Sequence, residues 1–195
     1  MTPAAETLET VGQARARYFA DAGFPPDGGY AEKFVQLAKL GPIPVGFPNS
    51  DARRRAVALH DLHHVATGYC TDWTGEAEIS AWEIASGCGA FWFAWFINLQ
   101  GMVMGWVVNP GATWRAFVRG RHSRNLYGEA GFSETLLRES VTSLRARLGL
   151  DRAAPAARAR DVVGYAFWCS LAAVEAAASL AAVAVPIVWV LRRLF

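Results

Sequence analysis

The residues best suited to chemistry lie in one short stretch, because three of the four histidines are His60, His63 and His64, and Asp61 stands among them. An α-helix turns by about 100° per residue, so His60 and His64 would stack one turn apart on the same ridge. Asp61 would lie on one flank of this ridge and His63 on the other. Two imidazoles four residues apart have the spacing with which a single helix binds zinc. We therefore expect a metal site on His60 and His64.

Acidic residues near this ridge could complete the site. Asp61 is close enough to serve as a fourth ligand or to orient an imidazole, and the polar turn of residues 69–75 can return Glu76 to the ridge. Glu78 and Glu83 are alternatives to Glu76 that the spacing alone does not exclude. Two imidazoles with two carboxylates suit zinc, manganese or non-haem iron, so these residue types predict a divalent cation.

The same residues match a known signature. His60-Asp61-x-x-His64, eleven further residues and then Glu76 resemble the HDxxHx11E motif of the Coq4 family of ubiquinone (coenzyme Q) biosynthesis proteins. Residues 64–76 and 119–127 are also similar to segments of that family, and the resemblance covers about residues 25–150. His63 is not part of the motif.

The resemblance implies a mostly helical, membrane-associated enzyme in which His60, Asp61, His64 and Glu76 bind the metal and carry the catalysis. Zinc is the expected ion, with iron, manganese and magnesium left open. The implied reaction is loss of the ring carboxylate from a polyprenylated quinone precursor, coupled to hydroxylation at the same carbon. The expected partners are this precursor or another prenyl lipid, the membrane, other quinone-biosynthesis enzymes and further copies of the chain in a homo-oligomer.

Two other functions fit the same residues. A non-catalytic scaffold that presents prenyl lipids to other enzymes would keep the metal site without turnover. An unrelated metal-dependent hydrolase would instead turn over generic phosphate or acyl esters. A phosphohydrolase built on a His-Asp pair is disfavoured, because it needs a further upstream histidine and none precedes His60.

Composition excludes several other classes of protein. With 53% hydrophobic and 18% charged residues the chain is not intrinsically disordered, and its net charge of +2 is too small to indicate nucleic-acid binding. Cys70, Cys88 and Cys169 are irregularly spaced, which argues against a disulfide framework or a cysteine zinc site. The first residues lack the features of a secretory signal. We expect a membrane-associated protein on the cytoplasmic side of the inner membrane, if the source is bacterial.

The pattern of apolar residues and helix breakers predicts an all-α fold, a compact helical domain with an appended C-terminal hydrophobic helix. Prolines exclude a helix over residues 41–48, and no β-alternation of useful length is visible. The predicted domains are a helical metal-binding domain (1–150), a linker (151–161) and the C-terminal helix (162–195). Within the domain, helices are predicted over residues 4–22, 30–40, from Asn49, Ser50 or Asp51 to Gly68, 76–108 and 133–148.

Two segments hold the excess of hydrophobic residues. Residues 84–108 carry no charge, and we interpret them as a core helix, with a tunnel for a lipid tail or a membrane span as alternatives. Residues 162–191 carry a single charge, Glu175, and Trp189 stands near two terminal arginines as at a membrane interface. We interpret 162–195 as a membrane anchor. The alternative is a helix docked on protein that satisfies Glu175.

A basic loop follows the first apolar segment. Arg119 and Arg121, with His122 and Arg124, could bind a diphosphate, a ring carboxylate or a lipid headgroup. The competing interpretation is a solvated loop without a ligand.

Overall fold

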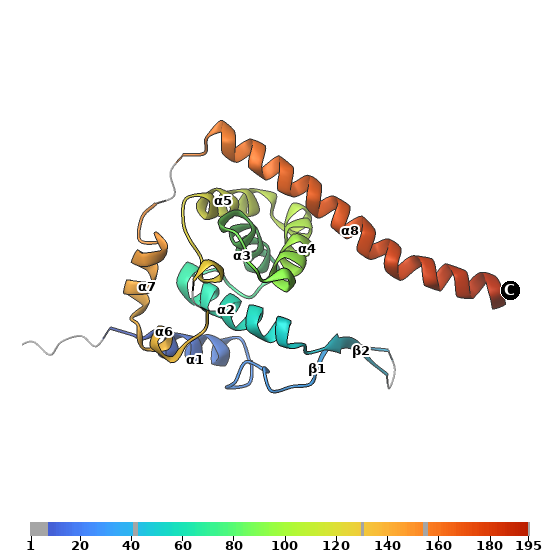
Figure 1. Ribbon diagram of the computed structural model, residues 1–195, viewed down its shortest axis with the longest axis horizontal. Coiled ribbons are helices and arrows are strands. Elements are labelled where there is room, and N and C mark those ends of the chain that lie inside the picture. Colours follow the sequence, from blue (N-terminus) through green and yellow to red (C-terminus); the bar gives the residue numbers. More distant parts are fainter. Residues whose placement is uncertain (1–7, 41–42, 130, 154–155, 195) are drawn as a thin grey trace, which may run out of the picture.

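The computed structural model describes residues 8–40, 43–129, 131–153 and 156–194, and the chain within these ranges is mostly helical (Figure 1). The predicted all-α class with an appended apolar C-terminal helix is confirmed. The elements in chain order are α1 (Val11–Asp21), β1 (Phe34–Leu40), β2 (Ile43–Pro48), α2 (Asp51–Thr67), α3 (Trp73–Ser86), α4 (Trp92–Val108), α5 (Pro110–Arg121), the 3-10 turn η1 (Leu126–Gly128), α6 (Glu134–Arg138), α7 (Val141–Leu148) and α8 (Ala159–Leu194).

Helix α2 carries the histidine motif and is packed against α1, α3, α4 and α7. The Ser50 hydroxyl caps its first turn by accepting a hydrogen bond from the Arg53 amide. Gly68 ends it with a φ of 78°, a left-handed conformation that favours glycine. Both ends therefore form where the sequence predicted them.

Helix α3 packs against both α4 and α5, and this contact forms much of the core. Trp82 of α3 and Met102 of α4 are fully buried there. Glycines let the helices come close, because a Cβ at Gly101 of α4 would overlap with the Ser80 hydroxyl and one at Gly120 of α5 with the Trp82 carbonyl. At least part of the apolar segment 84–108 is therefore a core helix, as predicted.

The close contact of α3 and α4 predicts a strong effect of a single methyl group. Gly101→Ala should lower the free energy of unfolding by about 1–3 kcal/mol, because Ser80 is buried and cannot move aside without disturbing α3. Gly111→Ala is the matched control in an exposed helical position, where alanine is neutral or stabilises by up to about 1 kcal/mol. Chemical denaturation of both variants measures the difference, and equal stabilities would contradict this packing.

The predicted helix over residues 30–40 is wrong, because this segment forms an antiparallel hairpin instead. Strand β1 pairs with β2 in a register that sets Phe34 opposite Pro48 and Leu40 opposite Ile43. The prolines prevent β2 from forming a helix, yet they are tolerated at the edge of a sheet. Pairing with this strand overrides the weak local helix preference of β1.

Two predicted helices are interrupted. The helix predicted from residue 76 to 108 breaks into α3 and α4 at Gly87 and Gly89, whose φ values are 94° and 51°. The one predicted over 133–148 breaks into α6 and α7, because Ser140 forms an antiparallel bridge with Thr10. The N-terminal helix begins at Val11, and residues 4–7 of its predicted range lie outside the described residues.

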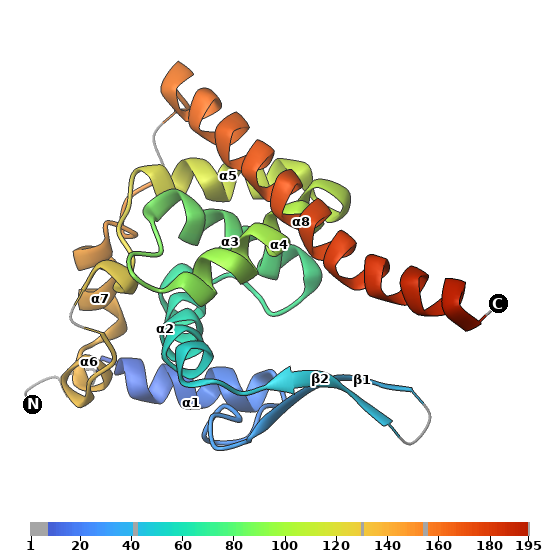
Figure 2. The same ribbon diagram turned by 45° about the vertical axis from the view of Figure 1, so that its right-hand side comes forward.

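Helix α8 is docked over its first half and extends away from the other helices over its second half (Figures 1 and 2). Trp168 stacks on Trp95 of α4 with ring centroids 5.0 Å apart, and the Gln100 amide donates a hydrogen bond of 2.8 Å to Glu175. The first half of α8 is therefore docked on α4, and Glu175 is hydrogen-bonded there, as the alternative interpretation of this segment expected. Residues Ala159–Pro186 form the one helix in the described residues that is long and apolar enough to cross a membrane.

Candidate metal centre

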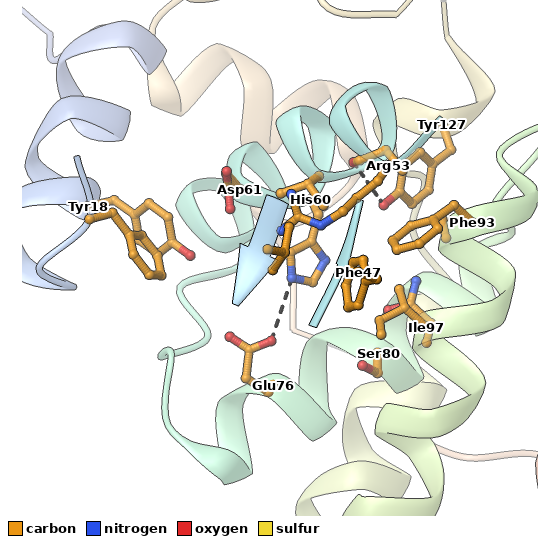
Figure 3. A pocket seen from close by; sticks show the side chains of 16 residues that line it. Tyr18, Phe47, Arg53, His60, Asp61, Glu76, Ser80, Phe93, Ile97 and Tyr127 are labelled. Atoms are coloured by element: carbon orange, nitrogen blue, oxygen red, sulfur yellow. Dashed lines mark hydrogen bonds and ion pairs between the residues drawn. The ribbon is translucent and has the colours of Figure 1, made fainter. Parts of the chain in front are cut away.

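Three side chains of the predicted site converge, namely His60 and His64 of α2 and Glu76 of α3. The two Nε2 atoms are 3.2 Å apart, and one Glu76 carboxylate oxygen lies 3.5 Å from Nε2 of His64. The other oxygen lies 3.6 Å from Nε2 of His60 (Figure 3). Tetrahedral zinc with donor distances of about 2.0–2.1 Å holds its ligands about 3.4 Å apart. The residues present therefore fit a divalent cation such as zinc with little rearrangement.

The ring of His64 is held in the tautomer that a metal ligand needs. Its Nδ1 donates a hydrogen bond of 2.9 Å to the Tyr69 carbonyl, which leaves the Nε2 lone pair facing the cluster. Burial, together with the neighbouring His60, lowers the pKa of His64 to about 4. The Tyr18 ring stacks on the imidazole with centroids 5.3 Å apart. His64 is thus neutral and oriented at pH 7.

Glu83 holds the other imidazole from behind. One oxygen of this fully buried carboxylate accepts hydrogen bonds from Nδ1 of His60 (2.9 Å) and Nδ1 of His63 (2.6 Å). Its second oxygen accepts from the Tyr127 hydroxyl (3.0 Å) and from the Asn98 amide. Nε2 of His60 is left to face the cluster. Glu76 therefore lies near Nε2 of His60, and Glu83 lies at Nδ1 on the opposite edge of the ring. The sequence spacing alone did not distinguish these two glutamates.

The charge on Glu83 is stabilised by these donors. Burial acts to raise its pKa, but the adjacent His60 and His63 outweigh it and hold the pKa of Glu83 below its usual value. Burial likewise disfavours a charge on His60, yet Glu83 raises the pKa of His60 well above 6.5. His63 differs, because its Nε2 accepts a hydrogen bond from the Leu126 amide (2.9 Å) and burial lowers its pKa. His63 is therefore a neutral structural partner of Glu83.

Asp61 is buried beside this cluster and accepts a hydrogen bond from the Tyr30 hydroxyl. Burial raises the pKa of its carboxyl. The group of ligand atoms within 4.8 Å of one another comprises His60, His64 and Glu76 and does not include Asp61. Its role as a fourth ligand stays a prediction.

The structure places Arg119 and Arg121 in contacts within the protein. Arg119 donates a hydrogen bond of 3.1 Å to the Thr67 carbonyl at the end of α2, and its guanidinium lies 5.3 Å from the centre of the Tyr69 ring. Nε of Arg121 lies 3.6 Å from the Asp161 carboxylate at the start of α8. Neither lines the cavity beside the candidate metal ligands, so the headgroup role predicted for them has no geometric support.

A cavity of about 360 Å³ opens beside the candidate ligands His60 and Glu76. Polar groups of the cluster lie at one side, while Phe47, Phe93 and Ile97 form an apolar wall at the other (Figure 3). Helix α4 thus contributes side chains to this cavity as well as to the core, and a tunnel for a lipid tail along residues 84–108 stays a prediction. The lining residues are Tyr18, Phe24, Val35, Phe47, Arg53, Ala56, Val57, His60, Asp61, Glu76, Ser80, Phe93, Ala94, Ile97, Asn98 and Tyr127.

The sequence did not indicate that Glu83 accepts hydrogen bonds from two of the histidines or that Arg53 lines the cavity. Glu83 follows Glu76 by seven residues, two helical turns, and this spacing could have placed both on one face of α3. No local pattern distinguishes Arg53 from its neighbours Arg54 and Arg55. No protein-family model, curated protein or solved structure matches the chain.

Proposed function

We propose that the chain is a metal-dependent enzyme of the Coq4 type, which removes the ring carboxylate from a polyprenylated precursor of ubiquinone. One observation carries this proposal. His60, His64 and Glu76 converge, and two of them, His60 and Glu76, line a cavity whose opposite wall is apolar. Such a site suits a ligand with a small polar head and a hydrocarbon tail.

A bound divalent cation would supply a Lewis acid that stabilises negative charge on the head of the substrate. The bond between ring carbon and carboxylate breaks, carbon dioxide leaves, and the ring carbon keeps the electron pair until it takes up a proton. In a coupled hydroxylation the ring carbon would instead bond to one oxygen atom of dioxygen, while the other oxygen atom leaves as water with two electrons from an external reductant and two protons. Glu83 and the Tyr69 carbonyl orient the two imidazoles, and Phe47 and Phe93 keep water from the apolar side of the cavity.

Lipid mass spectrometry of a strain that lacks the gene tests this function. We expect a ring-carboxylated prenyl intermediate to accumulate, and to disappear with the wild-type gene but not with His64→Ala. An unchanged quinone profile would refute the proposal. Purified protein that keeps its metal but does not convert the intermediate would favour a scaffold, and turnover of generic esters would favour a hydrolase.

Helix α8 is the proposed membrane anchor, since prenylated substrates reside in the bilayer. Its second half exposes apolar side chains, among them Leu180 (72% exposed) and Val183 (64% exposed). A lysine near the centre of a membrane-embedded helix costs about 2.5–3.5 kcal/mol. The exposed apolar side chains support association with a membrane, and for a bacterial source the proposed location is the cytoplasmic side of the inner membrane.

Lysine substitutions in α8 test this anchor. We expect the variant Leu180→Lys/Val183→Lys to float with liposomes far less than the wild type while it keeps its metal content. Thr135→Lys, which adds a lysine to the exposed surface of α6, serves as the control and should float like the wild type. Equal flotation of all three proteins would contradict the anchor.

A further inference from the structure

Arg53 is the one arginine or lysine among the described residues that line the cavity. Its guanidinium donates a hydrogen bond of 2.9 Å to the Asn49 side-chain oxygen and forms no ion pair with a described carboxylate. Asp61 lies near enough to attract it, but this carboxylate is hydrogen-bonded to Tyr30. A guanidinium has five N–H donors, so most of those of Arg53 are available to a ligand.

The position of Arg53 is fixed by a rigid partner. Asn49 is buried, and its amide nitrogen donates to the carbonyl of Glu32 at 2.8 Å and to those of Gly29 and Tyr30 at 3.4 Å. These bonds orient the amide so that its oxygen faces Arg53. The guanidinium is therefore held at the cavity wall before any ligand arrives, which reduces the entropy lost on binding.

We infer that Arg53 binds the carboxylate of an amphipathic aromatic acid in this cavity. The inference rests on the proposed function, because it assigns the group that recognises the acid before the carboxylate is lost. A planar guanidinium can form two parallel hydrogen bonds with a carboxylate. The hydrocarbon tail of the same ligand would contact Phe47, Phe93 and Ile97, which line the cavity with Arg53. Arg53 thus takes the role that the sequence suggested for Arg119 and Arg121.

Two probes that differ only in the acid group test this assignment. One is 4-hydroxybenzoate with a geranyl chain, and the other is geranylphenol without the carboxylate. Binding to the zinc-loaded full-length chain in detergent micelles is measured by titration calorimetry. We expect wild-type protein to bind the acid at least about tenfold more tightly than the phenol, since a charge-assisted pair is favourable in a half-buried site.

Three variants separate the charge of Arg53 from its structural contact. Arg53→Gln removes the charge but keeps an amide donor for Asn49, and it should weaken binding of the acid about 10–100-fold while leaving the phenol unchanged. Arg53→Lys should recover part of the preference for the acid. Arg55→Gln is the matched control, because Arg55 is exposed on the same helix and does not line this cavity. It should bind both probes like the wild type.

Several results would overturn the assignment. The first is that the wild-type protein shows no preference for the acid, and the second is that Arg53→Gln weakens the binding of both probes equally compared with the wild type. The third is that Arg53→Gln loses its zinc, so the zinc content of every variant is measured. Turnover provides a separate readout. If the Arg53-dependent preference is found and the acid is not decarboxylated, the assignment stands and the proposed reaction fails. If the acid is decarboxylated but binds no more tightly than the phenol, the proposed reaction stands and the assignment of Arg53 fails.

Discussion

His64→Ala should abolish tight zinc binding by the purified chain. The Nε2 atoms of His60 and His64 lie 3.2 Å apart with Glu76 beside them, so removal of His64 leaves two of three converging ligands. Loss of a residue that only orients a ligand through a hydrogen bond costs about 10–100-fold in metal affinity. Loss of a ligand should exceed this, so we expect a decrease of more than about 100-fold. Competition with a zinc-binding dye, together with elemental analysis after dialysis, measures the change.

The fourth histidine provides a control for this substitution. Nε2 of His122 lies 3.3 Å from the Asp161 carboxylate near the start of α8, and His122 does not belong to the ligand cluster. His122→Ala should therefore keep the zinc content and affinity of the wild type. A His64→Ala protein that is folded by circular dichroism and retains full zinc affinity would refute the metal centre.

The parts of the site that the sequence predicted depend on local signals. The positions of His60 and His64 follow from one helical turn, and Ser50 and Gly68 mark the ends of that helix. Glu76 returns to the ridge because Asp72 caps α3 by accepting a hydrogen bond of 2.7 Å from the Gly75 amide. All of these signals lie within a few residues of the feature they determine.

The parts that the sequence did not predict depend on contacts between distant segments. The hairpin forms because β1 pairs with a proline-rich strand, and no periodicity in β1 alone indicates this. Arg53 is held at the cavity by a hydrogen bond to Asn49, and Asn49 is in turn hydrogen-bonded to the Glu32 carbonyl in the segment before β1. The partners of Glu83 include Asn98, fifteen residues away, and Tyr127, forty-four residues away. Helix periodicity can place a carboxylate on a face, but only tertiary packing determines which donors surround it.

Substitution of Glu83 should therefore affect both stability and metal binding. Glu83→Ala leaves the Nδ1–H groups of His60 and His63 and the donors of Asn98 and Tyr127 buried without their acceptor. Removal of one partner from a buried charged network costs about 3–5 kcal/mol, which is a large fraction of the ~5–15 kcal/mol that is typical of a domain, roughly a third to a half at mid-range. Urea denaturation of the metal-free protein measures the loss.

Glu83→Gln separates the orienting role of the carboxylate from its role in stability. The amide keeps the volume of the side chain, but it has one acceptor oxygen and cannot accept from donors on both sides. His60 then loses its fixed orientation, and we expect zinc affinity to fall by about 10–100-fold even where the variant folds. Glu78→Gln on the same helix is the matched control, because Glu78 is partly exposed and lies outside the ligand cluster. If Glu83→Gln binds zinc as tightly as Glu78→Gln, the buried carboxylate serves packing alone, and His60 is oriented by the metal and Glu76.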